Sequence, residues 1–315
     1  MKNTLKDLNV YKASKQQGLI NALIEKNPII DSMPMKGASH GIYNVYAKLD
    51  DVDAMSEVDY DDELPVVGVS RSLGRTRLGL IGGVLPMPKK AAQEMGGYDK
   101  FAADRIVPII QKSGNKHESV VYYDGFLKNA ITNGHAVSCS GVTANKQYSM
   151  VFVHYDMDST VGLYNPNCAS NGKLFVTTLL GGGYDDFIEV NGKKCVGRMI
   201  EMEMEFGVQM ADDRMIGALV NIEPKANVSD PDKIDGLPTR MQIEDRLAGV
   251  RAEPSSTFIY CHPTLLGYLA IKYQLPQRVI DNQTTGIRYT LTDWNGIPLV
   301  GSYNVKWGTE AVVSL

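Results

Sequence analysis

The five histidines of the chain show no spacing that would bring two of them together on one metal ion. They are His40, His117, His135, His154 and His262. None of them belongs to an H-E-x-x-H or H-x-H arrangement, in which one helix or strand presents two imidazoles to the same ligand. A zinc site assembled from distant positions stays open as an alternative, but the sequence itself predicts no metal site.

Glycine, serine and aspartate patterns also fail to complete a catalytic site. Gly181–Gly183 is not followed by the Gly-Lys-Ser/Thr that a phosphate-binding loop requires, so it is typical of a surface turn. Gly68–Ser72 lacks the second glycine of a nucleophile elbow. Asp212-Asp213 is typical of a turn, with a local ion pair from Asp212 to Arg214. We therefore predict that the protein is not an enzyme and binds no cofactor.

The cysteines are expected to be free thiols. Cys139, Cys168, Cys195 and Cys261 lie tens of residues apart and form no C-x-x-C motif. The opening segment Met1–Asp7 lacks the apolar core of a signal peptide, and disulfides belong mainly to exported proteins. Disulfides in a secreted protein are the alternative.

The composition is that of an ordinary globular protein. The chain has 315 residues, 43% hydrophobic and 22% charged, which suits one large or two modest domains. The formal net charge of -4 argues against nucleic-acid binding by the whole chain, which usually shows as a basic patch. No apolar run approaches the roughly 20 residues of a membrane span, so we expect no membrane contact.

The elements that would position any functional residue are clearest between Val196 and Ile222. Within this stretch Ile200–Phe206 alternates apolar and acidic residues, and successive strand side chains point to opposite faces. One face would carry the methionines and Phe206, and the other the three glutamates. A turn at Ala211–Arg214 precedes a second apolar run, Met215–Ile222. The pattern predicts a long half-buried strand followed by a return or continuation.

The first 35 residues form a polar and mildly basic lead-in. Apolar residues at helical spacing predict a short amphipathic helix over Lys15–Glu25, and Asn27-Pro28 would end it. The basic side chains are Lys2, Lys6, Lys12 and Lys15.

Residues 36–83 predict a long two-stranded ribbon. Ile42–Tyr46 is typical of a strand, and a basic strand returns after Pro65. The outgoing half holds the acidic residues Asp50, Asp51, Asp53, Glu57, Asp59, Asp61, Asp62 and Glu63. The returning half holds Arg71, Arg75 and Arg77. Such a ribbon is only marginally stable alone, so we expect it to lie on another surface.

A helical region is expected to follow the ribbon. Pro86–Pro88 predicts a break, and apolar residues from Tyr98 to Ile131 recur at helical spacing. Pro108 and Gly114 interrupt this pattern, and because proline removes one helix hydrogen bond we expect a kink or two segments.

The rest of the chain, from residue 148 to 222 and beyond, is expected to be rich in strands. The predicted strands are Met150–Tyr155, Gly172–Val176, Ser256–Tyr260 and Asn295–Val300. Asn191-Gly192 predicts a hairpin turn, Asn227–Arg240 a loop, and Pro263–Tyr273 a helix.

Seven segments carry a resemblance to a known family. They are Gly18–Pro34, Gly41–Tyr46, Leu80–Val84, Tyr123–Phe126, Val161–Pro166, Met204–Ile222 and Thr309–Ala311. In this order they resemble the major capsid proteins of tailed bacteriophages with the Hong Kong 97 fold, and most closely the short-tailed group typified by epsilon fifteen. Two departures are an aromatic shifted within Tyr123–Phe126 and Met204-Glu205-Phe206 where the family often has Tyr-x-Trp.

The resemblance implies an α+β fold with four parts. These are an N-terminal arm at 1–35, an extended loop at 36–84, a peripheral domain with a spine helix and antiparallel sheet at 85–222, and an axial domain at 223–315. Residues 132–147 could join either domain. Some relatives cross-link the extended loop through Lys and Asn, but no matching motif is recognisable in this chain.

The resemblance also implies a major capsid protein that self-assembles into the icosahedral head shell around double-stranded DNA. The expected partners are further copies in hexamers and pentamers, scaffolding, portal and decoration proteins, and DNA contacted non-specifically. The protein would reside in the virion and assemble in the cytoplasm of the host bacterium. Inter-subunit contacts are expected at Asp50, Asp51, Asp53, Asp61, Asp62, Glu63, Arg71, Arg75 and Arg77. Interior DNA contacts are expected at Lys2, Lys6, Lys12 and Lys15.

Two alternative interpretations stay open. An encapsulin-like compartment shell of the same fold would enclose cargo enzyme in place of DNA. A hydrolase with a dispersed site would instead be a monomer or small oligomer with a deep polar pocket.

Overall fold

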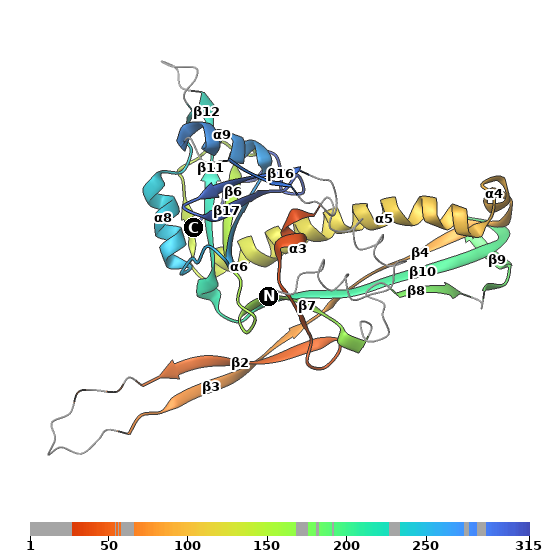
Figure 1. Ribbon diagram of the computed structural model, residues 1–315, viewed down its shortest axis with the longest axis horizontal. Helices are drawn as coiled ribbons and strands as arrows, with labels where there is room; N and C mark the ends of the chain where they lie inside the picture. Colours follow the sequence, from red (N-terminus) through yellow and green to blue (C-terminus); the bar gives the residue numbers. More distant parts are fainter. Residues whose placement is uncertain are drawn as a thin grey trace.

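A computed structural model describes residues 27–53, 55, 57, 66–167, 176–180, 183–190, 192–226, 234–273, 277–281 and 288–315. Three parts are visible in Figure 1: a long helix lying along a long sheet, a compact α/β unit at one end, and a two-stranded hairpin that projects from the body. The mixed α+β class is confirmed. The predicted helix over Lys15–Glu25 and most of the predicted strand Gly172–Val176 lie outside the described residues.

The long sheet is built on one strand of eighteen residues, β10. Its strand order is β1-β7-β10-β4, and β8 and β9 also pair with β10. The bounds are β1 Met35–Gly37, β4 Gly79–Pro88, β7 Thr160–Tyr164, β8 Val176–Leu180, β9 Asp186–Val190 and β10 Lys193–Met210. The alternating pattern is confirmed, because Met202, Met204 and Phe206 are buried, whereas the glutamates that precede each of them are partly exposed. The predicted hairpin turn is confirmed too, since Gly192 stands at φ 76° between paired β9 and β10.

The predicted break at Pro86–Pro88 is wrong. β4 continues to Pro88, with Pro86 opposite Met199 and Pro88 opposite Gly197 of β10. β4 ends the strand order on this side, and proline is tolerated on an edge strand because its missing N–H takes no part in the ladder. The chain changes structure only after Pro88, where α4 (Lys89–Glu94) begins.

The predicted helical region is confirmed, but its irregularity lies elsewhere. α5 (Tyr98–Val120) continues through Pro108, which is exposed, so the carbonyl that loses its hydrogen bond can reach water. The departure from α-helical geometry comes at a π-helical segment, Val121–Leu127, before α6 (Lys128–Thr132). His117 of α5 packs edge-on against Phe206 of β10, with ring centroids 4.9 Å apart.

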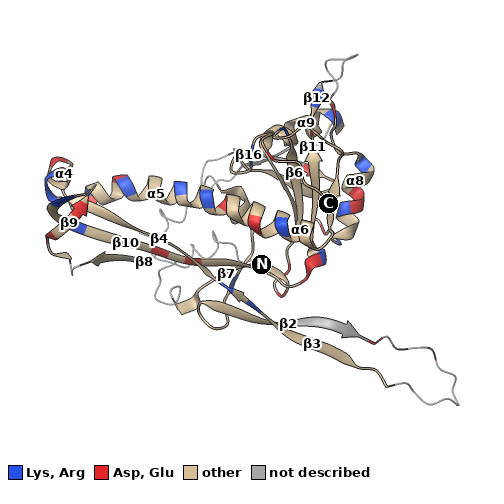
Figure 2. Ribbon diagram, turned by 180° about the vertical axis from the view of Figure 1, so that it is seen from behind, with Lys and Arg blue, Asp and Glu red and all other residues tan. Residues whose placement is uncertain are grey.

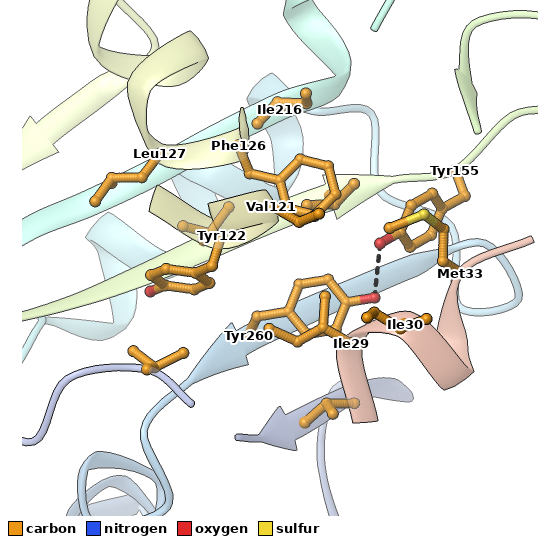
Figure 3. Close-up of a cluster of buried hydrophobic side chains, with 14 of the residues drawn as sticks. Ile29, Ile30, Met33, Val121, Tyr122, Phe126, Leu127, Tyr155, Ile216 and Tyr260 are labelled. Atoms are coloured by element: carbon orange, nitrogen blue, oxygen red, sulfur yellow. Dashed lines mark hydrogen bonds between the residues drawn. The ribbon is translucent and has the colours of Figure 1, made fainter. Parts of the chain in front are cut away.

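The π-helical segment faces the main hydrophobic core. Its wider turn places four of its side chains in the core: Val121, Tyr122, Phe126 and Leu127. Figure 3 shows these residues in one cluster with Ile29 and Ile30 of α3 (Pro28–Ser32) and with Met33, which directly follows that helix. Asn27-Pro28 was predicted to end a helix, whereas Pro28 begins one, a position where its fixed φ and missing N–H suit the first turn.

The compact unit contains a sheet of seven strands with the order β15-β16-β17-β14-β6-β11-β5. The bounds are β5 Ala136–Ser138, β6 Tyr148–His154, β11 Ile216–Ile222, β14 Thr257–Cys261, β15 Gln277–Asp281, β16 Arg288–Trp294 and β17 Ile297–Gly301. Helices α8 (Arg240–Gly249) and α9 (Pro263–Tyr273) pack against it through a second apolar cluster. A small two-stranded sheet joins β12 (Lys225–Ala226) to β13 (Ile234–Asp235). The predicted strands corresponding to β6, β14 and β17, and the predicted helix corresponding to α9, are confirmed.

β10 and β11 do not pair with each other, so the run after the turn is a continuation into a second sheet. A short 3-10 helix, Asp213–Met215, makes the turn, and Arg214 forms the expected ion pair with Asp212 at 2.8 Å. The predicted domain boundary between residues 222 and 223 stays a prediction. β6 and β11, which precede it, share one sheet with β14, which follows it.

Helix α8 follows the segment Asn227–Arg240, for which the sequence predicts a loop, and no helix was predicted there. Its N-terminus is a capping box in which Gln242 N donates to Thr239 Oγ1 at 3.2 Å and Thr239 N donates to Gln242 Oε1 at 2.8 Å. The spacing Thr-x-x-Gln is a known signal for a helix start. That signal was present in the sequence and could have identified the helix.

Candidate functional site

The projecting hairpin consists of β2 (Tyr43–Val52) and β3 (Val69–Arg77), as the sequence predicts. The strands pair in antiparallel register, with Tyr43 opposite Arg77 and Ala47 opposite Leu73. The register shifts between Leu49 and Asp51, which marks a β-bulge. In Figure 1 the hairpin lies clear of both sheets over most of its length.

The root of the hairpin is fixed to the long sheet by buried amides. Asn44 Nδ2 donates to Gln209 Oε1 at 2.5 Å, and Gln209 Nε2 donates to the Asp158 carbonyl at 2.7 Å. Asn44 Oδ1 in turn accepts from Ser39 N at 2.9 Å. Because buried amides lose energy when a partner is removed, this chain of hydrogen bonds fixes where the hairpin leaves the body.

One face of the hairpin carries a preorganised cation. The Arg75 guanidinium lies 3.9 Å from the centroid of the Tyr43 ring. The His40 ring also stacks on the Tyr43 ring, and their centroids are 5.0 Å apart. Arg75 and Arg77 are exposed, and neither has an ion pair within the described part of the chain. Cation–π packing therefore orders Arg75 while its N–H donors remain available.

The opposite face contains a close contact between an aromatic ring and a glycine. Tyr46 lies opposite Gly74, and a Cβ added to Gly74 would clash with the Tyr46 ring. The ring therefore covers the glycine, a pairing that stabilises strands in which glycine packs poorly.

Large apolar side chains are exposed along β3 and the segment before it. Leu73 is 80% exposed, Val69 57% and Val66 98%. Alternation along a strand places Val69, Leu73, Arg75 and Arg77 on one face. A contiguous face of apolar and cationic side chains is characteristic of a protein interface.

The structure places the predicted contact residues as follows. Asp50, Asp51 and Arg71 lie on the paired strands, and only their backbone is described. Asp53 closes the described end of the hairpin, because its carboxylate accepts from Gly68 N at 2.9 Å and its own N–H donates to the Gly68 carbonyl at 3.1 Å. The predicted residues outside the described part are Asp61, Asp62, Glu63, Lys2, Lys6, Lys12 and Lys15.

A buried carboxylate joins the start of the described chain to the core. Glu118 of α5 is fully buried and accepts hydrogen bonds from Ile29 N at 2.9 Å and from Asn304 Nδ2 at 2.7 Å. Asn304 Nδ2 also donates to Asn27 Oδ1 at 3.0 Å. Burial raises the pKa of Glu118 to about 7, although hydrogen bonds from Ile29, Asn304 and Ser302 oppose the shift. No local sequence pattern predicts this junction, because its members are far apart in the chain.

In the ranges that the structure describes, no group of at least three His, Cys, Asp or Glu side chains is placed to hold a metal ion. No described helix is both long and apolar enough to cross a membrane. Cys139, Cys195 and Cys261 are free thiols, and Cys168 lies outside the described residues.

Comparisons with known proteins identify the fold. No protein-family model matches the chain, and no curated protein matches it. Among solved structures, the chain is similar to that of bacteriophage epsilon15, with 13% identity, TM-score 0.51 and coverage of 89% of this chain and 88% of the other. It is also similar to the bacteriophage JBD30 capsid, with 7% identity, TM-score 0.52 and coverage of 86% and 88%. A long helix beside a long sheet, a compact α/β unit and a projecting hairpin, matched over this length, are the Hong Kong 97-type capsid fold.

Proposed function

We propose that the protein is the major capsid protein of a tailed bacteriophage, which self-assembles into an icosahedral head shell around double-stranded DNA. The fold supports this proposal, because the similar structures are bacteriophage structures and one is described as a capsid. Within that fold we favour the epsilon fifteen-like group, on the residues that carry the resemblance.

The observation that carries the proposal is the hairpin itself. Its strands project from the body and expose Leu73, Val69 and two arginines, Arg75 and Arg77, that form no ion pair with the described residues. A ribbon of two strands is marginally stable alone, and such a face gains free energy when a partner covers it. A fixed root combined with an uncovered ribbon suits a segment that lies on a neighbouring subunit.

The proposed organisation keeps the predicted arm at 1–35 and the extended loop at 36–84, and changes the predicted division into a peripheral domain at 85–222 and an axial domain at 223–315. Because β6 and β11 share a sheet with β14, we propose that these two strands belong to the axial domain although they precede residue 223. The partners would be other copies in hexamers and pentamers, together with scaffolding, portal and decoration proteins. The predicted interior DNA contacts are Lys2, Lys6, Lys12 and Lys15.

Electron microscopy of the expressed full chain tests the proposal. Closed shells that elute in the void volume of a gel-filtration column are the expected result. A monomer or small oligomer under all assembly conditions would instead favour the hydrolase alternative. Particles purified from the native host should contain double-stranded DNA, whereas cargo protein without DNA would favour the encapsulin-like compartment.

Deletion of residues 50–63 tests the role assigned to the hairpin. The root contacts at Asn44 and Gln209 are retained, so we expect a folded subunit. This subunit should fail to close a shell because the ribbon that would reach a neighbour is shortened. Shells of normal size and stability from the deleted chain would contradict the role.

A further inference from the structure

The exposed side of α5 carries a row of basic residues. Arg105, Lys112 and Lys116 are exposed, and the two lysines follow the arginine by seven and eleven positions. Because an α-helix turns through about 100° per residue, these spacings place the three side chains within about 40° of one another, along roughly 16 Å of the helix axis. Figure 2 shows basic positions along α5. The three residues form one stripe, the basic face of α5.

The basic face points away from the long sheet. Ile110 and Gly114 are buried, and with two methionines of β10 they line a small cavity beneath the helix. Lys112 follows Ile110 by two positions, and Lys116 follows Gly114 by two, which is a rotation of about 200° in each case. The two lysines therefore lie on the side of α5 opposite to the sheet.

The cations of the basic face have little neutralising charge beside them. Within the described residues neither Lys112 nor Lys116 belongs to an ion pair. Arg105 pairs only with Asp104, at 3.5 Å and with both side chains exposed, and exposed pairs contribute little. The next carboxylate along the helix, Glu118, is buried. Positive charge on this face is therefore available to a partner.

The other side of the sheet has the opposite charge. Alternation along β10 places Glu201, Glu203 and Glu205 on the face that points away from α5, since Met202 and Met204 line the cavity beneath the helix. The glutamates are partly exposed, and none forms an ion pair with another described residue. Figure 2 shows acidic positions in the strand layer below α5. The layer made by α5 and the long sheet is therefore basic on its helix side and acidic on its strand side.

This polarity decides which side of the layer suits a polyanion. Double-stranded DNA carries one negative charge for about every 1.7 Å of its axis, so it is repelled by the strand side and attracted by the helix side. A protein partner would need an apolar core to its interface. The apolar residues exposed on α5 between the basic ones, Val107 and Ile109, are only 37% and 38% exposed. The basic face is therefore better suited to phosphate groups than to a protein.

We propose that the basic face of α5 contacts the phosphate backbone of the packaged double-stranded DNA through Arg105, Lys112 and Lys116. The inference rests on the proposed function and adds a DNA-contacting surface on the described body of the chain, separate from the predicted lysines of the arm. Over roughly 16 Å one DNA strand presents about five phosphates, so the three cations find partners in any register and with any base sequence. Because every copy in the shell repeats the stripe, contacts that are weak individually act together.

Formaldehyde crosslinking of DNA-filled particles tests the contact where it would occur. Formaldehyde joins a lysine amine to an amine of a nearby nucleobase through a methylene bridge. Peptides that contain Lys112 or Lys116 should be recovered with crosslinked nucleotides from filled particles and without them from empty shells. Crosslinks confined to the lysines of the arm would overturn the proposal.

The salt dependence of DNA binding by dissociated subunits gives a second measure. Each phosphate contact contributes about 0.9 to the slope of log K against log salt concentration, so Lys112→Gln with Lys116→Gln should reduce the slope by about 1.8. Fluorescence anisotropy with a short labelled duplex measures this slope. Lys112→Arg with Lys116→Arg keeps both charges and should retain the wild-type slope. Glutamine is a good helix former at exposed positions, and circular dichroism checks that each variant is folded.

A matched control separates the basic face from net charge. Lys193 and Lys194 are exposed at the start of β10, so Lys193→Gln with Lys194→Gln makes the same change in net charge away from α5. This variant should keep the wild-type slope. An equal loss of slope in the control would overturn the proposal, because net charge alone would then explain the binding.

The outcomes separate this inference from the proposed function. DNA-filled shells without a crosslink at α5, or a slope that the α5 glutamine pair leaves unchanged, overturn the DNA contact while the shell still supports the proposed function. Crosslinks from Lys112 or Lys116 to a protein in empty shells, with none to DNA in filled particles, would assign the basic face to an acidic protein and also overturn the inference. If the wild-type chain forms no DNA-filled shells, the proposed function fails and this inference fails with it.

Discussion

Replacing Glu118 by glutamine is expected to remove a large part of the pH dependence of subunit stability. The carboxylate is fully buried and has no cationic partner among its hydrogen-bond donors, which are Ile29 N, Asn304 Nδ2 and Ser302. Burial disfavours the charged form, so the pKa of Glu118 rises from 4.5 to about 7 on folding.

The direction of this pH dependence follows from the protons that the folded and unfolded states bind. The folded state holds the proton more tightly than the unfolded state, so this group stabilises the fold fully below pH 4.5, and the contribution is lost as the pH rises to about 7. At about 1.36 kcal/mol for each pH unit, the whole change is about 3 kcal/mol. Glutamine cannot ionise and has one acceptor oxygen. One donor therefore loses its partner, which costs about 1 to 3 kcal/mol at every pH.

Chemical denaturation of dissociated wild-type and Glu118→Gln subunits at several pH values between 4.5 and 8 measures the effect. The free energy of unfolding of the variant, minus that of the wild type, should rise by about 3 kcal/mol across this range. Glu94→Gln, at an exposed position of α4, controls for removal of one surface charge and should stay within about 0.5 kcal/mol of the wild type. Parallel profiles for wild type and Glu118→Gln would refute the reasoning.

Three further predictions concern the strand, the hairpin and the thiols. Met202→Arg should abolish soluble protein because it buries a charge, whereas Glu203→Gln should change the stability of the free subunit by less than about 0.5 kcal/mol; equal tolerance in expression and denaturation assays would contradict the register of β10. Backbone amides of β2 and β3 beyond Asn44 should exchange hydrogen rapidly in the free subunit and slowly in the shell, and equal protection in both would exclude ordering by a neighbour. Titration of denatured, unreduced protein should find four thiols per chain, and linked chains on a non-reducing gel would disprove this.

Elements with a clear periodicity were predictable from the sequence. The alternation over Ile200–Phe206 identified β10 and the side that it buries, because a period of two fixes which residues share a face. The continuous apolar run ending at Ile222 identified a buried strand, now β11. Periodicity does not identify a partner, however, and β10 and β11 belong to different sheets. Strand pairing depends on contacts far apart in the chain, which no local pattern specifies.

Local signals failed where tertiary packing decided the outcome. Pro86 and Pro88 predicted a break, but an edge strand accommodates residues that donate no hydrogen bond. Pro108 predicted a kink, yet the regular helix ends only where Val121–Leu127 turn their side chains into the core. The hydrogen bonds of Glu118 reach Ile29 and Asn304, which lie 89 and 186 positions away in the chain. No short window of sequence could therefore predict this junction.

The charged residues show how far sequence reasoning about the site can extend. The sequence identified basic residues on the returning strand of the ribbon, and the structure finds Arg75 and Arg77 exposed there. It also identified the glutamates of β10, but only as the solvent side of a half-buried strand. A three-dimensional arrangement was needed to see that both charged faces lack partners within the described residues, and that the hairpin of one subunit points away from its own glutamates. The hairpin also leaves Leu73 and Val69 exposed, and a two-stranded ribbon of this kind gains stability when another molecule covers it, which is the physical reason to expect this chain to assemble.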